Sequence, residues 1–399
     1  MYLSGIEFAF CIMLSVMEKI MNSSNLDFSE LRKQTINAQN SHRTIYNHDI
    51  INWSSDGVKE NHLCSGRALG LSEPGDIIQL HPELESEWGS INHHYHRIGL
   101  PFTESVIWNT DYEILTNYPR YDPSVCYLGR DIYDDYGHST FFQIVNYINS
   151  KNNFVRVAQD LELPILQTFC YEDKTQITDT SIFPYPCYLK SSHSDSETDV
   201  YRCKDQMELF LALTNFSDNI PLQIQEDVNS VTYLTIDYRV NIKKAEHFAI
   251  TEYSLDDFQH KKISFPSLYS CWEITDKLAE YLYFRGMKGV FGFNVAVVNK
   301  NSNLEYKLID CMPRFSHASY STWIAKKLGA QCWVAEDVLT NLKSLSKLDL
   351  KGIEYNSKSS SGIVLINWGT ILMGKLSVLF VGSPQHQVNL KKELMNRIS

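Results

Sequence analysis

Gly289 to Arg314 reads GVFGFNVAVV, then the polar turn NKNSN, then LEYKLIDCMPR. Two apolar runs joined by an asparagine-rich connection predict a β-hairpin. Asp310, Met312 and Arg314 are two residues apart, so they share one face of the second strand. With Asn294 expected opposite them on the first strand, the hairpin presents a carboxylate and a guanidinium together. This arrangement is typical of a site for a metal ion and a phosphate group.

The composition of the 399-residue chain is that of a globular protein, with 43% hydrophobic and 21% charged residues. Its length allows two or three domains, each with a core of its own. The net charge of −11 argues against nucleic acid as a partner, because phosphate neutralisation needs a basic surface. We therefore expect small-molecule ligands.

The cysteines and the apolar runs predict the cellular location of the protein. Nine scattered cysteines without a CxxC pair predict reduced thiols and a cytoplasmic location. The apolar run 8–17 lacks the basic flank and the cleavage site of a signal peptide, so we expect a core-facing helix there. No later apolar run approaches the ~20 residues that cross a bilayer, and no membrane association is expected.

The pattern of apolar residues changes along the chain. After residue 75 short strands alternate with helices, which predicts a parallel or mixed sheet. From residue 141 the pattern predicts helices and antiparallel strands. The helices are expected at 152–163, 204–214, 272–285 and 321–344, and the strands at 222–228, 233–242, 247–253 and within 362–381.

One histidine-rich stretch invites a metal interpretation. His93, His94 and His96 lie close together, but no cysteine or acid stands at zinc spacing from them. We expect these histidines to be surface or capping residues.

Three further polar features precede the hairpin in a fixed order. Lys151 stands just before a predicted helix, and Lys190 ends a strand that opens into a polar loop. Gln225, Glu226, Asp227 and Val228 close another predicted strand. Each feature alone is weak, since an isolated lysine usually faces solvent.

Taken together, these features resemble the ATP-grasp superfamily of carboxylate–amine ligases over roughly residues 149–320. The resemblance implies an α/β (α+β) fold with mixed and antiparallel sheets. It places an N-terminal helix, a polar segment and a pre-ATP-grasp αβ domain in 1–140. A two-lobed ATP-grasp domain would follow in 141–345, with the smaller lobe at about 165–228, and an αβ extension in 346–399.

The resemblance also assigns roles to the residues that match its motifs. Lys151 and Lys190 would bind the phosphates of ATP, and Asp310 with Asn294 would hold Mg²⁺. Arg314, together with Arg239 from the segment I-D-Y-R-V, would contact a reacting acyl phosphate. The adenine would lie against the hinge formed by Gln225, Glu226, Asp227 and Val228. A plainer alternative pairs Arg239 and Arg314 with Asp237 and Asp310 as cross-strand salt bridges.

The hairpin departs from the family pattern at its metal ligands. The family offers Asp on the first strand and Glu-x-Asn-x-Arg on the second, where this chain has Asn294, Asp310 and Met312. Magnesium prefers hard oxygen ligands, so a thioether is a poor replacement. Glu305 lies an odd number of residues before Asp310, and strict alternation puts it on the opposite face.

The loop expected to cover the phosphates also departs from the pattern. It contains no glycine and carries Asp195, Glu197 and Asp199. The simpler interpretation is a loop facing solvent; the other is a loop that meets a cationic substrate or partner.

Two functional hypotheses follow. The first is an ATP-dependent ligase that joins a small carboxylate to an amine, with an amino acid or peptide as a candidate substrate, through an acyl phosphate. The second is a catalytically degenerate relative that binds a nucleotide or ligand, or serves as a partner subunit. Related ligases are often dimers, so the resemblance leaves a homodimer open.

Overall fold

The computed structural model describes residues 43–50, 61–126, 140–193, 200–256 and 259–398. The helix expected at 8–17 and the acids Asp195, Glu197 and Asp199 lie outside these ranges. Among the helices so described, none is long and apolar enough to cross a membrane.

The N-terminal part contains a four-stranded parallel sheet in the order β3-β2-β1-β4. Ile45 and Ile78 are buried in it, so short apolar runs between polar turns suffice to form its strands. The strand β1 was not expected, because the surrounding sequence is polar. The elements are β1 (Arg43–Asn47), η2 (Asn61–Leu71), β2 (Ile77–Gln79), η3 (Pro82–Glu87), α3 (Trp88–Ile98), β3 (Val106–Ile107), η4 (Tyr112–Asn117) and β4 (Tyr121–Val125).

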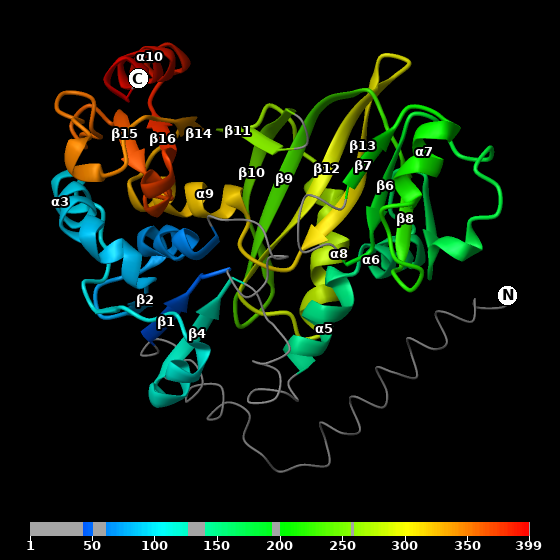
Figure 1. Ribbon diagram of the computed structural model, residues 1–399, viewed down its shortest axis with the longest axis horizontal. Helices are drawn as coiled ribbons and strands as arrows, with labels where there is room; N and C mark the ends of the chain where they lie inside the picture. Colours follow the sequence, from blue (N-terminus) through cyan, green and yellow to red (C-terminus); the bar gives the residue numbers. More distant parts are fainter. Residues whose placement is uncertain (1–42, 51–60, 127–139, 194–199, 257–258, 399) are drawn as a thin grey trace, which may run out of the picture.

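A second four-stranded sheet is antiparallel, in the order β5-β8-β6-β7. It lies at the right of Figure 1, with α7 packed on it. Leu189, Leu209 and Ile224 form the centre of its core. The elements are β5 (Thr168–Tyr171), η5 (Lys174–Gln176), β6 (Cys187–Ser191), β7 (Val200–Cys203), α7 (Gln206–Leu213) and β8 (Leu222–Glu226).

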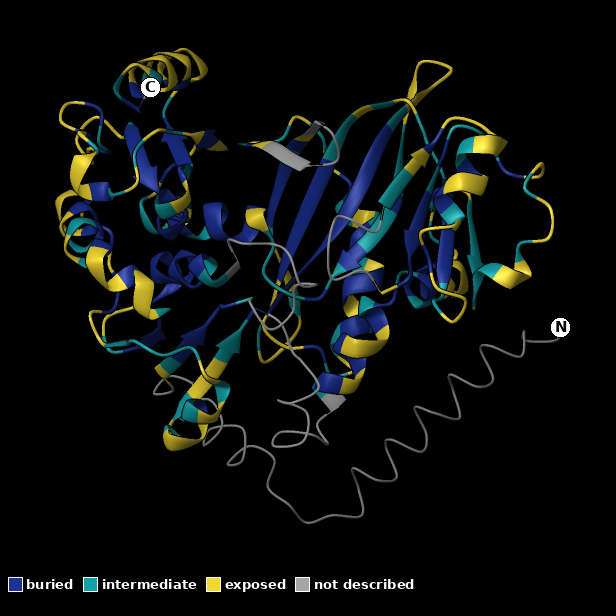
Figure 2. Cartoon of the chain, viewed as in Figure 1, coloured by how far each residue is buried: buried dark blue, intermediate teal, exposed yellow. Residues whose placement is uncertain are grey.

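The largest sheet has eight antiparallel strands in the order β13-β12-β9-β10-β11-β14-β16-β15. Its strands are mostly buried, as the dark central ribbons of Figure 2 show. The strands are β9 (Ser230–Val240), β10 (Ala245–Asp256), β11 (Gln259–Phe265), β12 (Val290–Lys300), β13 (Asn303–Met312), β14 (Trp333–Leu339), β15 (Gly362–Leu365) and β16 (Lys375–Val381). The parallel sheet and the two antiparallel sheets confirm the expected fold class.

Helices complete this part of the molecule. Alternation in β9 turns Leu234, Ile236 and Tyr238 towards the cluster that includes residues of α5, α6 and α8. The opposite face of the same strand carries Thr235 and Asp237, near the start of α9. The elements are α5 (Thr140–Asn149), α6 (Lys151–Asp160), α8 (Trp272–Phe284), α9 (His317–Lys327), η7 (Leu345–Lys347), η8 (Gly369–Met373) and α10 (Pro384–Ile398).

The predicted hairpin is confirmed as β12 and β13. Asn301 and Ser302 form its two-residue turn with φ angles of 51° and 68°. Positive φ at both central positions is the geometry of a type I′ turn, whose twist matches that of paired strands. The helix expected over 321–344 is only partly correct, because α9 ends at Lys327 and Gly329 follows with φ 68°. The residues after it form β14, which fills the gap between β11 and β16.

Candidate functional site

Lys190 lies near the end of β6 and is buried, with 9% of its surface exposed. Its ammonium donates a hydrogen bond to the Gln225 side-chain oxygen at 2.7 Å, and the Gln225 amide donates to the Thr168 hydroxyl at 3.1 Å. Burial lowers the pKa of Lys190 to about 8; Asp310 opposes this shift and Lys151 adds to it. The charges of Lys151 and Asp310 are therefore close enough to act on Lys190.

The start of α6 is tied to the end of β6, which brings the two lysines together. Ser150 caps the helix through its side chain, and its hydroxyl lies 2.9 Å from that of Ser192. The Lys151 amide donates to the Ser192 carbonyl at 2.9 Å. Lys151 and Lys190 thus lie at the adjoining ends of α6 and β6, and their role in binding phosphate stays a prediction.

The hinge residues span the end of β8, with Gln225 and Glu226 as its last two residues and Asp227 and Val228 directly after it. Glu226 accepts a hydrogen bond from the Gln167 amide at 2.8 Å and lies 3.3 Å from the Lys307 ammonium. Asp227 pairs with Arg202 at 2.7 Å, so its carboxylate is already engaged. In the part of the chain that the structure describes, the Val228 amide has no hydrogen-bond partner. This amide is available to donate a hydrogen bond to a ligand.

A row of polar side chains crosses the large sheet. Thr251, Thr235, Asn294 and Asp310 occupy successive partner positions on β10, β9, β12 and β13. The Thr235 hydroxyl donates to the Asn294 oxygen at 3.1 Å, and the Asn294 amide nitrogen donates to Asp310 at 2.9 Å. The Met312 sulfur lies 3.8 Å from that nitrogen. Asn294 therefore acts as a hydrogen-bond bridge between two neighbours.

These donors can be compared with what magnesium requires. Mg²⁺ sites commonly use one or two carboxylates together with phosphates and water. Asp310 supplies one carboxylate, the Asn294 oxygen is engaged by Thr235, and Met312 contributes only sulfur. The set fits one magnesium ion held by Asp310 and by a phosphate ligand, and it does not fit a pair of ions.

Glu305 lies on the same face as Asn294, contrary to the sequence prediction. Asn294 pairs with Asp310 but Val295 pairs with Leu308, so Ile309 is an extra residue that shifts the alternation. Glu305 pairs with Val298, four residues beyond Asn294 and so about 13 Å along the strand. Its carboxylate lies 3.4 Å from the Lys300 ammonium. Glu305 is therefore on the same face as Asp310 but too far from it to bind the same metal ion.

Asp237 is a buried acid that the sequence analysis considered only as a salt-bridge partner of Arg239. It is fully buried, and its Oδ1 accepts hydrogen bonds from Ser319 at 2.9 Å and Ser316 at 3.5 Å. Its Oδ2 has no partner among the described residues. Burial raises its pKa to about 7, against the lowering effect of the two serines. An acid between the buried residues Ile236 and Tyr238 was the signal that could have found it.

The two predicted arginines lie at the edges of this cluster. Arg239 is exposed, and its guanidinium lies 5.2 Å from the centre of the Trp323 ring. Arg314 donates to the Asn149 side chain at 3.0 Å. Asp237 is bonded to serines, and no Arg239–Asp237 ion pair occurs in the described ranges. The structure thus does not reproduce that part of the salt-bridge alternative.

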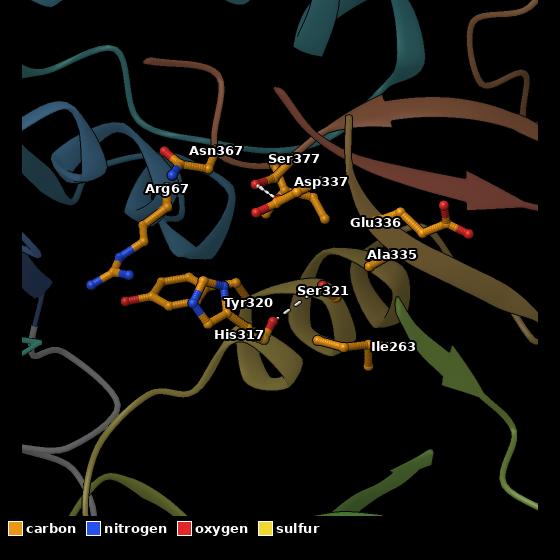
Figure 3. A pocket seen from close by; sticks show the side chains of 11 residues that line it. Arg67, Ile263, His317, Tyr320, Ser321, Ala335, Glu336, Asp337, Asn367 and Ser377 are labelled. Carbon is orange, nitrogen blue, oxygen red and sulfur yellow. Dashed lines mark hydrogen bonds between the residues drawn. The ribbon is translucent and has the colours of Figure 1, made fainter. Parts of the chain in front are cut away.

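A cavity lies between η2, the start of α9 and the strands β14 and β16 (Figure 3). It is small, with a volume of about 30 Å³. Arg67 is buried beside it, 4.9 Å from the centre of the Tyr320 ring, and donates to the Cys126 sulfur at 2.8 Å. Its Nε has no partner among the residues described, and neither has the Asn367 side-chain oxygen. Sequence reasoning missed Arg67, although an arginine within the run CSGRALGL is unusual.

Comparisons with known proteins identify similar solved structures but no similar sequences. No protein-family model matches the sequence, and no curated protein matches it. The N5-carboxyaminoimidazole synthase of Aspergillus clavatus, solved with ADP and 5-aminoimidazole ribonucleotide, has a TM-score of 0.55 at 11% identity, covering 82% of this chain and 99% of that one. The N5-carboxyaminoimidazole synthetase of Staphylococcus aureus, complexed with ADP, also scores 0.55, at 10% identity over 82% and 98% of the chains.

A third solved structure agrees with these two. The N5-carboxyaminoimidazole ribonucleotide synthetase of Thermus thermophilus has a TM-score of 0.54 at 11% identity, over 89% of this chain and 98% of its own. This protein shares the overall fold of these three synthetases. More specifically, it has the ATP-grasp fold, as the order of its motifs predicted. The domain boundaries and the roles of the site residues stay predictions.

Proposed function

We propose that the protein is an ATP-dependent ligase that joins a small carboxylate to an amine through an acyl phosphate. The observation that carries this proposal is the buried Lys190, which bonds Gln225 at 2.7 Å and interacts with the charges of Lys151 and Asp310. Two lysines lie around this buried position together with Asp310 and with Asp227, which is paired to Arg202, and this arrangement suits a magnesium-bound polyphosphate.

Each proposed role follows from the contacts of the residue. Lys151 and Lys190 bind phosphate oxygens, and Gln225 to Val228 present backbone groups to the adenine. Asp310, with Asn294 beside it, holds magnesium, which would neutralise phosphate charge when bound. The substrate carboxylate attacks the γ-phosphorus and ADP leaves; the amine then attacks the acyl carbon and phosphate leaves. Phosphoryl transfer of this kind depends mainly on positioning and charge neutralisation.

Two arginines and one acid complete the proposed machinery. Arg239 and Arg314 stabilise the charge of the acyl phosphate. Asp237 lies two residues before Arg239 on the same face of β9, and its Oδ1 accepts hydrogen bonds from Ser316 and Ser319. We assign it the role of positioning the start of α9 beside Arg239.

We assign an anionic group to one of the substrates. Arg67 is a buried cation without a carboxylate at ion-pair distance in the described chain, and its Nε is unpartnered. A buried charge is costly without a counter-charge, which a carboxylate or phosphate on a ligand would supply. Amino acids, short peptides and sugar-phosphate amines all carry such a group.

The second hypothesis, a nucleotide-binding protein without ligase activity, is supported by one specific contact. The Asn294 amide nitrogen donates to Asp310, where a second carboxylate would favour a second metal ion. Because Asn294 is neutral, a second metal ion is not bound and the phosphates are less well neutralised. This slows phosphoryl transfer without preventing nucleotide binding.

ADP release separates the two hypotheses. The full chain is incubated with ATP, magnesium and a panel of carboxylates and amines that includes amino acids, and ADP and the amide product are measured. We expect ADP to form only when both substrates are present, and Lys190→Ala to abolish it. Nucleotide binding without ADP from any pair would favour the second hypothesis.

A further inference from the structure

Three metal-ligating side chains meet in the N-terminal part of the molecule, on elements that do not contribute to the proposed nucleotide site. His62 lies at the start of η2, His81 caps η3, and Glu83 follows in η3. One ligand atom from each residue lies within 4.8 Å of the other two. The His62 Nε2 and a Glu83 oxygen are 3.1 Å apart, and the two imidazole centres are separated by 4.7 Å.

A buried serine fixes the two histidines relative to each other. The Ser65 hydroxyl accepts a hydrogen bond from the His81 amide at 3.1 Å and donates to the His62 carbonyl at 3.3 Å. Ser65 has no exposed surface. The backbones that carry the two imidazoles are therefore held in place without a metal ion, which reduces the ordering that binding would require.

The donor set indicates which ion suits the position. Two imidazoles and one carboxylate are a common ligand set for zinc, with bonds of about 2.0–2.2 Å and a tetrahedral arrangement. Ligand atoms around such an ion are about 3.4 Å apart, so small side-chain rotations would close the observed spacing. His81 accepts only a long hydrogen bond, 3.4 Å from the Glu83 amide, and this contact is weak enough to be displaced.

We infer that His62, His81 and Glu83 form a zinc site that fastens the start of η2 to η3. The Glu83 side chain is 60% exposed and that of His62 18%, so the ion can enter and its fourth position remains open to water. The net charge of −11 favours a cation. Arg67 lies five residues beyond His62 on η2, and the site would steady the segment that carries it.

An ordinary histidine–glutamate ion pair is the competing explanation, and the chain contains a matched example. His96 Nε2 and Glu104 are also 3.1 Å apart, and both side chains are more than half exposed. No third ligand was found beside them among the described residues. His96→Ala therefore controls for weak zinc binding by a surface pair.

The test is a calorimetric titration of the metal-stripped full chain with zinc chloride, together with thermal unfolding with and without zinc. We expect one zinc ion per chain, and a rise in the unfolding midpoint. His62→Ala, His81→Ala and Glu83→Gln should each weaken binding by at least about tenfold, the smaller end of the loss seen when even an outer metal contact is removed. His96→Ala should bind as the wild type does.

Two results would overturn the inference. One is the same zinc affinity in the wild type and in the His62→Ala/His81→Ala double variant. The other is an equal loss in His96→Ala and in Glu83→Gln. Because Glu83 is exposed, Glu83→Gln folds independently of the metal, and circular dichroism of each variant without zinc confirms that a loss of binding is not a loss of fold.

Discussion

The Lys190 ammonium and the Gln225 side-chain oxygen lie 2.7 Å apart on neighbouring strands of the small sheet. A neutral amide satisfies one donor of the lysine but leaves its charge uncompensated. Asp310 of the large sheet and Asp227 add favourable interactions, and Lys151 of α6 adds an unfavourable one. An anion arriving between the sheets would relieve this imbalance, which is the physical basis of the proposed nucleotide site.

The pKa of Lys190 predicts how nucleotide affinity depends on pH. Burial lowers that pKa to about 8, and phosphate binds the protonated form. Affinity for ATP should be constant below pH 8 and fall by up to about tenfold for each unit above it. Isothermal titration from about pH 7 to about pH 9.5 measures this, with Lys190→Arg as the control that keeps its charge and its affinity. A wild-type affinity as flat as that of Lys190→Arg would contradict the prediction.

Asp237 should make the folded protein less stable as the pH rises. Its carboxyl keeps its proton up to about pH 7 in the folded state, whereas the unfolded chain loses it near pH 4. The unfolded state therefore binds fewer protons between these values, and folding loses up to about 4 kcal/mol across that interval. Asp237→Asn should raise the free energy of unfolding at pH 8 and have little effect at pH 4.

Denaturant unfolding at both pH values gives the comparison. The sign of the difference in the free energy of unfolding between variant and wild type at pH 8 is decisive. If Ser319 stabilised the charged carboxylate, the substitution would lower the stability of the protein instead of raising it. A lower free energy of unfolding for Asp237→Asn at pH 8 would show that the carboxylate is stabilised where it lies.

Asn294→Asp should make the thermal stability of the protein depend more strongly on magnesium. The new carboxylate would lie at hydrogen-bond distance from Asp310, and the repulsion should lower the stability of the nucleotide-free protein by about 1–3 kcal/mol. Magnesium with ADP should restore the unfolding midpoint more in the variant than in the wild type. Equal magnesium effects on both proteins would place the ion away from Asp310.

Gly292 should not tolerate a side chain. A Cβ atom there would lie 2.9 Å from the Asp237 Oδ1 and 3.3 Å from the Ile236 carbonyl oxygen. Gly292→Ala should therefore reduce stability by about 1–3 kcal/mol, as crowding of a packed interior does. Gly89→Ala is the matched control, because nothing lies within 4 Å of its Cβ and the helix α3 should gain about 0.4–1 kcal/mol. Thermal unfolding measures the midpoints of both variants. Equal midpoints would show that the sheet around Gly292 can shift to accommodate a methyl group.

The parts of the fold that follow from local pattern were predictable. Two apolar runs around an asparagine-rich connection predicted the hairpin, which β12 and β13 confirm. The assignment of Lys151 and Lys190 to one site came from the family resemblance and stays a prediction. β1 and β14 were not predictable from pattern. β1 is held by pairing with β2 and β4, and β14 by pairing with β11 and β16, strands far away in the sequence.

The candidate site likewise depends on long-range contacts that local sequence patterns do not predict. The position of Glu305 depends on a single extra residue, Ile309, which no turn or glycine marks in the sequence. The burial of Arg67 and Asp237 depends on α9, which packs between η2 and strand β9 of the large sheet. Long-range packing of this kind decides which polar residues become buried, and it leaves no periodic signal.

The central claim is that Lys190 binds the phosphates of a nucleotide together with magnesium. Calorimetric titration with ATP, with and without magnesium, tests it in the wild type and in Lys190→Ala. We predict magnesium-dependent binding in the wild type and a loss of at least about tenfold in Lys190→Ala, since a charge-assisted hydrogen bond is worth about 1.5–3 kcal/mol. The same ATP affinity in both proteins, or no binding by a folded wild type, would contradict the account.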